Sequence, residues 1–182
     1  MSDKPPSGPR VRQVPNGDNR ERLVCPDCGY IVYDNPKVVV GAVCTWEEKI
    51  LLCRRAIEPR KGHWTFPAGF MELNESTQEG AAREVWEEAC ASIHIDGLLG
   101  IYEIPWIGQV CTFYHAHLTS ADFAPGEESL ETALFERHEI PWDSIAFPSI
   151  RWALACYEKR AEGPCMHVAE RTSLDDSLTN EV

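Results

Sequence analysis

The fold is decided by residues 69–91, GFMELNESTQEGAAREVWEEACA. Ser76 and Glu79 have the S-x-x-E spacing of a capping box, which predicts a helix that begins at Thr77. Because positions i, i+3 and i+4 share one helix face, this helix aligns three carboxylates, here called the helix glutamates: Glu84, Glu87 and Glu88. Like charges at this spacing repel each other by about a few tenths of a kcal/mol per pair. A hard cation such as magnesium or manganese would offset that repulsion.

Spacing alone leaves a second interpretation open, since most acidic runs on helices are solvated faces. Three features favour a catalytic cluster instead. The strand-like residues 64–69, WTFPAG, lead into the acidic helix, and Glu75 follows Gly69 at a fixed distance. In addition, Arg83 places a cation inside the acidic run.

The same stretch resembles the Nudix box, with the pattern G-x5-E-x7-R-E-U-x-E-E-x-G-U, where U is aliphatic. The chain matches it at seven positions: Gly69, Glu75, Arg83, Glu84, Val85, Glu87 and Glu88. It departs at the late glycine, where Cys90 stands, and at the last aliphatic position, which is Ala91. Because the glycine normally ends the helix, the departure at Cys90 concerns only the helix C-cap.

This resemblance implies a role for each matched residue. The helix glutamates would bind magnesium or manganese, assisted by the backbone carbonyl of Ala68. Arg83 would orient their carboxylates, and Glu75 would brace the loop that begins at Gly69 against the helix. The bound ions would bridge a pyrophosphate and lower the pKa of the attacking water.

A further glutamate is expected on the loop before a late strand. In many Nudix hydrolases such a residue acts as the general base or as an extra metal ligand. The loop sequence PGEESLE offers Glu128 as the candidate, with Glu127 and Glu131 as alternatives.

Three longer segments narrow the resemblance to one subgroup: residues 34–43, 53–76 and 123–147. They are similar to zinc-ribbon-linked FAD and ADP-ribose pyrophosphatases, and the similarity extends over roughly residues 23–160. It implies hydrolysis of FAD to FMN and AMP, or of ADP-ribose to AMP and ribose 5-phosphate. The S-Q-P-W-P-F-P signature of NADH pyrophosphatases is absent, which argues against NADH as the main substrate. A module that binds ADP-ribose-like ligands without cutting them is the alternative, and the complete set of glutamates argues against it.

Residues 54–63 form a basic segment with four cationic residues and one acidic residue in an acidic chain. They are either a phosphate-facing patch or a solvated loop. By the resemblance, Arg54 and Arg55 would contact phosphate or a second subunit of a homodimer. Trp106 and Phe113 would stack on a substrate ring, or else pack in the core or at a dimer interface. Two histidines at i, i+2 on a predicted strand, His115 and His117, either bind metal or pack.

The first 36 residues are expected to form two parts. Residues 1–22 are rich in proline and charge and predict a flexible arm, while residues 23–36 resemble a remnant of a zinc ribbon. Cys25 and Cys28 form one C-x-x-C knuckle, but no cysteine or histidine precedes them. Because a structural zinc site needs four ligands, a metal-free knuckle is favoured over a zinc site.

The order of elements predicts an α/β fold, with a hairpin over residues 38–55, the acidic helix, further strands and a helix over residues 148–160. This order agrees with the Nudix-type α/β/α sandwich around a mixed sheet. The hydrolase domain is expected over residues 37–162 and a tail over residues 163–182, with a short strand possible at residues 165–168.

Charge and composition limit the classes of function. A net charge of −12 argues against nucleic-acid or anionic-membrane partners, and no apolar run is long enough to span a membrane. A small-molecule nucleotide is therefore the expected substrate. Eight cysteines without a signal sequence predict reduced thiols and a cytoplasmic protein.

Overall fold

The computed structural model describes residues 8–171 and divides the chain into two units, Met1–Pro36 and Lys37–Val182. The outer parts of the expected arm and tail, residues 1–7 and 172–182, lie outside the described residues.

The first unit is a small antiparallel sheet in the order β1-β2-β3, formed by Val11–Gln13, Arg22–Val24 and Ile31–Val32. The expectation of an arm without regular structure is therefore wrong from residue 11 onward. Residues 14–21, one part of the stretch that suggested an arm, form the turn between β1 and β2, where Asp18 N–H donates to the Pro15 carbonyl at 3.0 Å.

The second unit contains a mixed sheet, as expected, in the order β10-β5-β4-β9-β8-β11, with β6 beside β5 and β7 beside β4. Its strands are β4 Lys37–Trp46, β5 Lys49–Arg55, β6 Trp64–Thr65, β7 Ala68–Phe70, β8 Ile93–Ile104, β9 Gln109–Leu118, β10 Ser129–Phe135 and β11 Cys165–Val168. The pairs β4–β9 and β8–β11 are parallel, and the other pairs are antiparallel.

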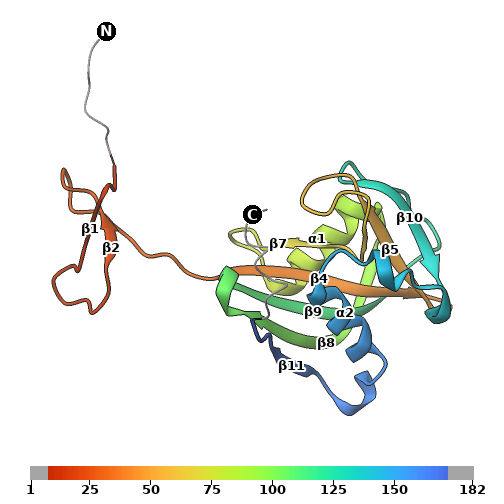
Figure 1. Ribbon diagram of the computed structural model, residues 1–182. Coiled ribbons are helices and arrows are strands. Elements are labelled where there is room, and N and C mark those ends of the chain that lie inside the picture. Colours follow the sequence, from red (N-terminus) through yellow and green to blue (C-terminus); the bar gives the residue numbers. More distant parts are fainter. Residues whose placement is uncertain (1–7, 172–182) are drawn as a thin grey trace, which may run out of the picture. The chain divides into compact units, whose positions relative to one another are not determined.

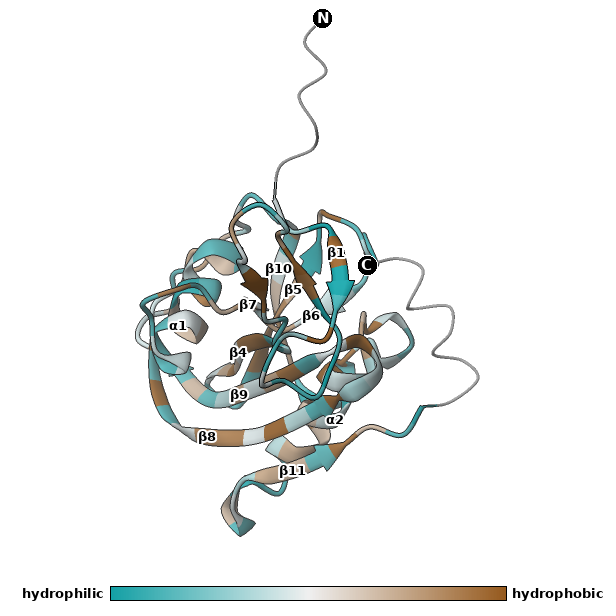
Figure 2. Cartoon of the chain, turned by 90° about the vertical axis from the view of Figure 1, so that its left-hand side faces the viewer, coloured by the Kyte–Doolittle hydropathy of each residue, from teal (hydrophilic) through white to brown (hydrophobic). Residues whose placement is uncertain are grey.

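Two helices cover the two faces of this sheet, α1 (Thr77–Ala89) and α2 (Pro148–Tyr157) (Figure 1). Four short 3-10 helices join the other elements: η1 Pro105–Ile107, η2 Arg137–Glu139, η3 Trp142–Ser144 and η4 Arg160–Glu162. Figure 2 shows the hydrophobic stretches along β4, β8 and β9 that these helices cover. One apolar cluster lies under α1 and another under α2, which is the expected α/β/α sandwich. Within the described part of the chain, the structure contains no helix with the length and hydrophobicity of a membrane span.

The ends of α1 follow from its sequence. Ser76 caps the helix by accepting from Glu79 N–H at 3.2 Å, and the Glu79 side chain accepts from Ser76 N–H at 2.8 Å, so the predicted capping box is confirmed. At the other end Cys90 adopts a left-handed conformation with φ of 48°, and its N–H donates to the Trp86 carbonyl. A side chain is strained at this position, which explains why glycine suits it.

The last strand extends the domain beyond the expected boundary at residue 162. β11 runs parallel to β8 and places Cys165 beside the end of α2, where it forms a disulfide with Cys156 across a Cα–Cα distance of 6.3 Å. The expectation of eight reduced thiols is therefore wrong for this pair. Compartment and composition suggested free thiols, but the helix-to-strand connection brings these two within bonding range. The other six cysteines are free thiols.

Candidate active site

Arg83 joins the loop after β7 to the acidic helix. Its Nε and Nη2 donate to the two carboxylate oxygens of Glu75 at 3.0 and 2.8 Å, and Nη2 also donates to the Phe70 carbonyl at 3.0 Å. Nη1 donates to Glu84 at 2.7 Å and to Glu87 at 2.8 Å. The planar guanidinium therefore fixes three carboxylates at once, a geometry that the single ammonium of lysine does not offer.

These hydrogen bonds keep both Arg83 and Glu75 charged. The fork of Arg83, together with the backbone N–H of Glu72, lowers the pKa of Glu75 to about 2. The same contacts raise the pKa of Arg83 above its usual range. The loop is consequently held by an ion pair throughout the neutral pH range.

The backbone of β7 lies directly against the acidic helix. The N–H of Ala68 donates to Oε2 of Glu88 at 3.3 Å. A side chain on Gly69 has no room, because a Cβ atom there would lie 2.5 Å from the carboxylate oxygens of Glu84. This close approach explains the glycine at the start of the motif and brings two helix carboxylates beside one strand.

Two of the helix glutamates are buried, at 8% exposure for Glu84 and 5% for Glu88. Burial and, to a smaller extent, the charge of Glu84 raise the pKa of Glu88 to about 8, against the opposing effects of the Ala68 N–H and Arg55. Burial also raises the pKa of Glu84, which Arg83 opposes. A buried carboxylate with so few donors is stabilised in its charged form when a cation binds it.

The loop between β9 and β10 packs against the C-terminal half of α1. Gly126 N–H donates to the Glu88 carbonyl at 3.0 Å, and Ala124 N–H donates to the Ala89 carbonyl at 2.9 Å. A Cβ atom on Gly126 would lie 1.7 Å from the Glu87 carbonyl oxygen, so only glycine permits this approach. The loop that carries the candidate Glu128 is thereby fixed to the helix that carries the helix glutamates.

Among the three candidates on this loop, Glu128 is the one whose charge acts on the buried carboxylates. It contributes to the raised pKa of both Glu84 and Glu88. Its backbone is anchored by Ala56 N–H, which donates to the Glu128 carbonyl at 2.8 Å. Glu131 lies instead at 3.6 Å from the guanidinium of Arg54. The geometry therefore favours Glu128 over Glu131 as the further carboxylate.

The two arginines of the basic segment, Arg54 and Arg55, differ in exposure and in the residues that they contact. Arg54 is exposed and, besides Glu131, contacts the Gly62 carbonyl at 3.0 Å. Arg55 is half-buried, donates to the Pro59 carbonyl at 2.9 Å and lies over the ring of Phe147 at 5.1 Å. Since Arg55 is close enough to lower the pKa of Glu88, it is the arginine nearer to the carboxylates in electrostatic terms.

The aromatic candidates are packed to different extents. Phe113 is buried in the cluster under α2, with its ring 4.9 Å from that of Phe66. Trp106 lies in η1 and is half-buried at the margin of the same cluster. The alternative of core packing therefore holds for Phe113, while Trp106 keeps a partly accessible ring.

The cysteine knuckle lies in the first unit. Cys25 is buried and Cys28 is exposed, and an ion pair between Arg10 and Asp27 lies beside them, with contacts of 2.7 and 3.0 Å. Within residues 8–171, these two thiols belong to no group of three or more His, Cys, Asp or Glu side chains with ligand atoms within 4.8 Å of one another.

Comparison with known proteins identifies the family. The family model described as the NUDIX domain matches residues 35–153, which is more than half of the chain. The chain belongs to the Nudix hydrolase family. A second family model, for the Nudix N-terminal zinc ribbon, matches residues 7–34. This match agrees with the ordered sheet of the first unit and with the resemblance of its knuckle to half of a ribbon.

Solved and curated relatives support this membership. A NUDIX hydrolase from Nitrosomonas europaea is 47% identical in its crystal structure, with a TM-score of 0.83 over 88% of this chain and 94% of that chain. An ADP-ribose pyrophosphatase from Methanocaldococcus jannaschii is 29% identical over 62% of this Nudix hydrolase and 69% of its own length. The NAD-capped RNA hydrolase NudC from Pseudomonas aeruginosa is 29% identical over 64% of this chain, which spans 41% of that relative.

One group of residues was missed by reasoning from the sequence of this Nudix hydrolase. His117 does not join its strand neighbour His115 but approaches His94 and Asp96 of β8. The strand register that creates this cross-strand group is not visible in the spacing of the residues along the chain.

Proposed function

We propose that this Nudix hydrolase cuts the pyrophosphate bond of FAD or ADP-ribose in a reaction that requires magnesium or manganese. The observation that carries the proposal is the pair of buried carboxylates, Glu84 and Glu88, held against β7 with the charge of Glu128 nearby. The similarity to a protein named ADP-ribose pyrophosphatase supports this substrate class. The assignment of FAD as a substrate rests on the resemblance of the longer sequence segments to the FAD and ADP-ribose pyrophosphatase subgroup.

The ligand chemistry fits a hard divalent cation, although the three helix glutamates, all within the described residues, form no group whose ligand oxygens all lie within 4.8 Å of one another. Carboxylate oxygens of the helix glutamates and the carbonyl of Ala68 are ligands that magnesium and manganese prefer. The raised pKa of the buried Glu88 supports the same assignment, because a cation offsets the desolvation of its charged form. Arg83 already contacts Glu84 and Glu87, so it would orient these carboxylates without occupying Glu88. Bound there, the ion would neutralise charge on the pyrophosphate and lower the pKa of a nearby water.

Four residues of the chain would each have a separate role in the reaction or in substrate binding. Glu128 would accept a proton from the attacking water, since its exposed carboxylate is within electrostatic reach of both buried glutamates. Arg55 would contact a phosphate oxygen with the donors that Pro59 leaves free. Arg54 would contact the substrate or a second subunit, and the half-buried Trp106 would stack on an adenine or flavin ring.

The test is a panel of substrates with the purified full chain and either metal. FAD, ADP-ribose, NADH and NAD-capped RNA are incubated separately, and nucleotide products are separated by chromatography. Release of AMP with FMN or with ribose 5-phosphate is expected. Absence of AMP from both FAD and ADP-ribose with both metals would overturn the proposal. Metal-dependent binding of ADP-ribose without product would favour a ligand-sensing module instead.

Two neighbouring variants assign the further carboxylate. Glu128→Gln is expected to lower kcat by at least about a hundredfold, as is typical for loss of a general base. Glu127→Gln is the matched control, because it removes the same charge from the adjacent position, and it should keep kcat within about threefold. Equal effects of the two substitutions would contradict the role of Glu128.

A homodimer and a cytoplasmic location also remain proposals from the resemblance and composition. Light scattering after size exclusion gives the mass in solution directly. The exposed apolar side chains Phe70, Leu73 and Trp86, at 47%, 89% and 58% exposure, supply surface that a second subunit would cover.

A further inference from the structure

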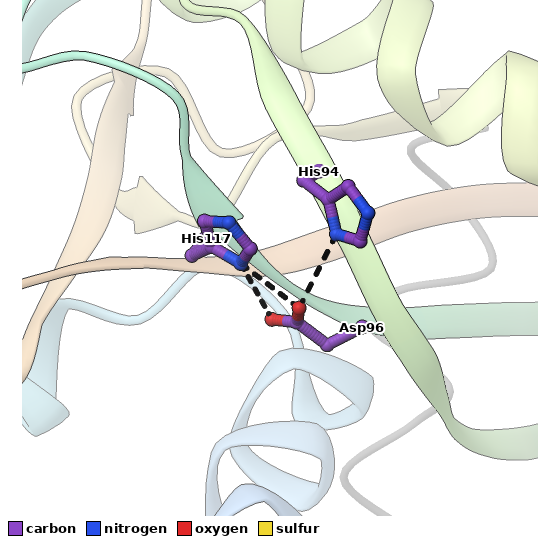
Figure 3. A group of neighbouring side chains, drawn as sticks. All are labelled: His94, Asp96 and His117. Atoms are coloured by element: carbon purple, nitrogen blue, oxygen red, sulfur yellow. Dashed lines mark hydrogen bonds and ion pairs between the residues drawn. The ribbon is translucent and has the colours of Figure 1, made fainter.

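Three side chains converge on β8 and β9, away from the helix glutamates: His94, Asp96 and His117, here called the His-Asp-His cluster (Figure 3). Nδ1 of His117 lies 2.8 and 3.0 Å from the two carboxylate oxygens of Asp96, and Nδ1 of His94 lies 3.4 Å from Oδ1. All three residues are exposed. Within residues 8–171, no other group of three or more such side chains brings its ligand atoms within 4.8 Å.

The register of the two strands creates this cluster. His94 lies directly opposite His117, and their rings stack with centroids 5.0 Å apart at 27°. The ladder shifts between Ile95 and Gly97, which leaves Asp96 as the unpaired residue of a β-bulge. Bulges redirect side chains, and here the carboxylate is directed at both imidazoles. Three potential ligands therefore come from only two strands with their positions fixed by the sheet.

The cluster lies on the sheet face opposite α1. Ile93 and Ile95 of β8 and Ala116 of β9 pack into the apolar cluster under α1. Because successive residues of a strand point to opposite faces, His94, Asp96 and His117 point to the other face. The sheet therefore separates them from the helix glutamates, and an ion bound here would share no ligand with the candidate active site.

This end of β8 is also an uncovered sheet edge. β11 pairs with β8 only from Gly100 to Glu103, so residues 93–97 have β9 as their one strand neighbour in the described part of the chain. An ion held by both β8 and β9 would cross-link the two strands where the ladder is interrupted by the bulge. Binding of such an ion should consequently raise the stability of the protein against unfolding, which can be measured.

The ligand chemistry differs from that of the helix glutamates. Imidazole nitrogens suit zinc, nickel and copper, whereas magnesium prefers oxygen alone. In a tetrahedral zinc site with bonds of about 2.0 to 2.1 Å, neighbouring ligand atoms are about 3.3 Å apart. The His94–Asp96 separation of 3.4 Å meets this value. The His117–Asp96 separation of 2.8 Å would widen by about half an ångström, which a small rotation of exposed side chains provides.

We propose that the His-Asp-His cluster is a second metal site, which takes a borderline transition ion such as Zn²⁺ or Ni²⁺ and cross-links β8 to β9. Water would complete the coordination, since the cluster is open to solvent. The rival explanation is that Asp96 serves only as a hydrogen-bond acceptor for the two imidazoles. The two explanations differ in whether zinc changes the environment of both rings together.

The test is a zinc titration of the metal-free full chain, with excess magnesium present to occupy the helix glutamates. Nitrogen-15 NMR signals of the six histidine rings report which imidazoles bind. Calorimetry gives the number of ions and their affinity for the wild type, Asp96→Asn and His117→Ala. His138→Ala is the matched control, because His138 is an exposed histidine outside the cluster. Zinc taken up by Cys25 and Cys28 would add an equivalent common to all four proteins.

The ring signals of His94 and His117 are expected to shift together and to saturate with the same equivalent of zinc. Asp96→Asn should weaken this binding at least about tenfold, and His117→Ala should bind one ion fewer than the wild type. The same equivalent should raise the melting temperature of the wild type and of His138→Ala. Unmoved signals of His94 and His117, or equal stoichiometry and affinity in the wild type and His117→Ala, would overturn the proposal.

Discussion

Replacing Glu88 by glutamine is expected to stabilise the metal-free protein at neutral and alkaline pH while it abolishes turnover. Burial raises the pKa of Glu88 to about 8 from its ordinary value of 4.5, so the folded state holds a proton that the unfolded state has released. The folded pKa is the higher one. This residue therefore supports folding most strongly below its ordinary pKa, and the contribution is lost as the pH rises through the folded value.

The size of the effect follows from the two pKa values. Over the interval between them, the free energy of unfolding falls by up to about 1.4 kcal/mol per pH unit because of this one group. By about pH 7 the wild type has lost about 3 kcal/mol through Glu88. Glutamine has nearly the same shape and no charge at any pH. The stability difference between Glu88→Gln and the wild type should thus be about 1 kcal/mol at about pH 5 and approach about 3 kcal/mol near pH 7.

Urea unfolding in the presence of a chelator, from about pH 5 to about pH 8.5, measures this difference. Glu87→Gln is the matched control, since Glu87 lies on the same helix but is exposed, and its stability curve should run parallel to that of the wild type. Addition of magnesium should then stabilise the wild type and not Glu88→Gln, because only a state that binds the ion gains stability from it. The turnover of Glu88→Gln with FAD or ADP-ribose should fall by orders of magnitude.

Two results would refute this reasoning. A difference in unfolding free energy between Glu88→Gln and the wild type that stays constant across the pH range would show that Glu88 is ionised in the folded metal-free protein. Full activity of Glu88→Gln would remove its carboxylate from the reaction altogether.

Three further outcomes are expected. Arg83→Lys should lower the free energy of unfolding by about 2 kcal/mol in urea titrations and reduce turnover more than about tenfold, because an ammonium cannot hold Glu75 by two parallel bonds; unchanged stability would contradict the bracing role. Cys90→Gly should raise the free energy of unfolding by about 1 kcal/mol, since Cys90 is exposed and left-handed at the end of α1. Elemental analysis of the purified full chain should show the same zinc content as the double variant Cys25→Ser, Cys28→Ser, because two thiols alone do not make a structural zinc site. Loss of one zinc per chain on substitution would show instead that these thiols bind zinc.

Much of the candidate site is local in sequence and was therefore predictable. The capping box at Ser76 and Glu79 sets the phase of α1, and the phase sets which carboxylates share a face. Arg83 lies four residues before Glu87, so their contact follows from helix geometry, whereas the contact of Arg83 with the adjacent Glu84 does not. The sandwich itself followed from the order of the elements and from the family resemblance.

The remainder depends on contacts between distant segments. The disulfide of Cys156 and Cys165 requires β11 to join the sheet beside β8, which composition does not predict. The His-Asp-His cluster depends on a strand register and on a bulge at Asp96, and a shift of one residue would separate its members. In the first unit, residues 14–21 form a turn instead of part of a flexible arm. The sequence did not distinguish the two, because turns and disordered segments share proline, glycine and charge.

The contact at Gly126 has a consequence for how this enzyme can change over evolution. With no space for a side chain between the loop and the Glu87 carbonyl, the loop that carries Glu128 lies directly against the helix. The groups proposed to react are thus already close together in the structure without substrate, an arrangement that lowers the entropic cost of a reaction. Insertions and substitutions that alter substrate choice are therefore expected in exposed loops that make no such close approach, because changes there would leave Glu128 beside α1.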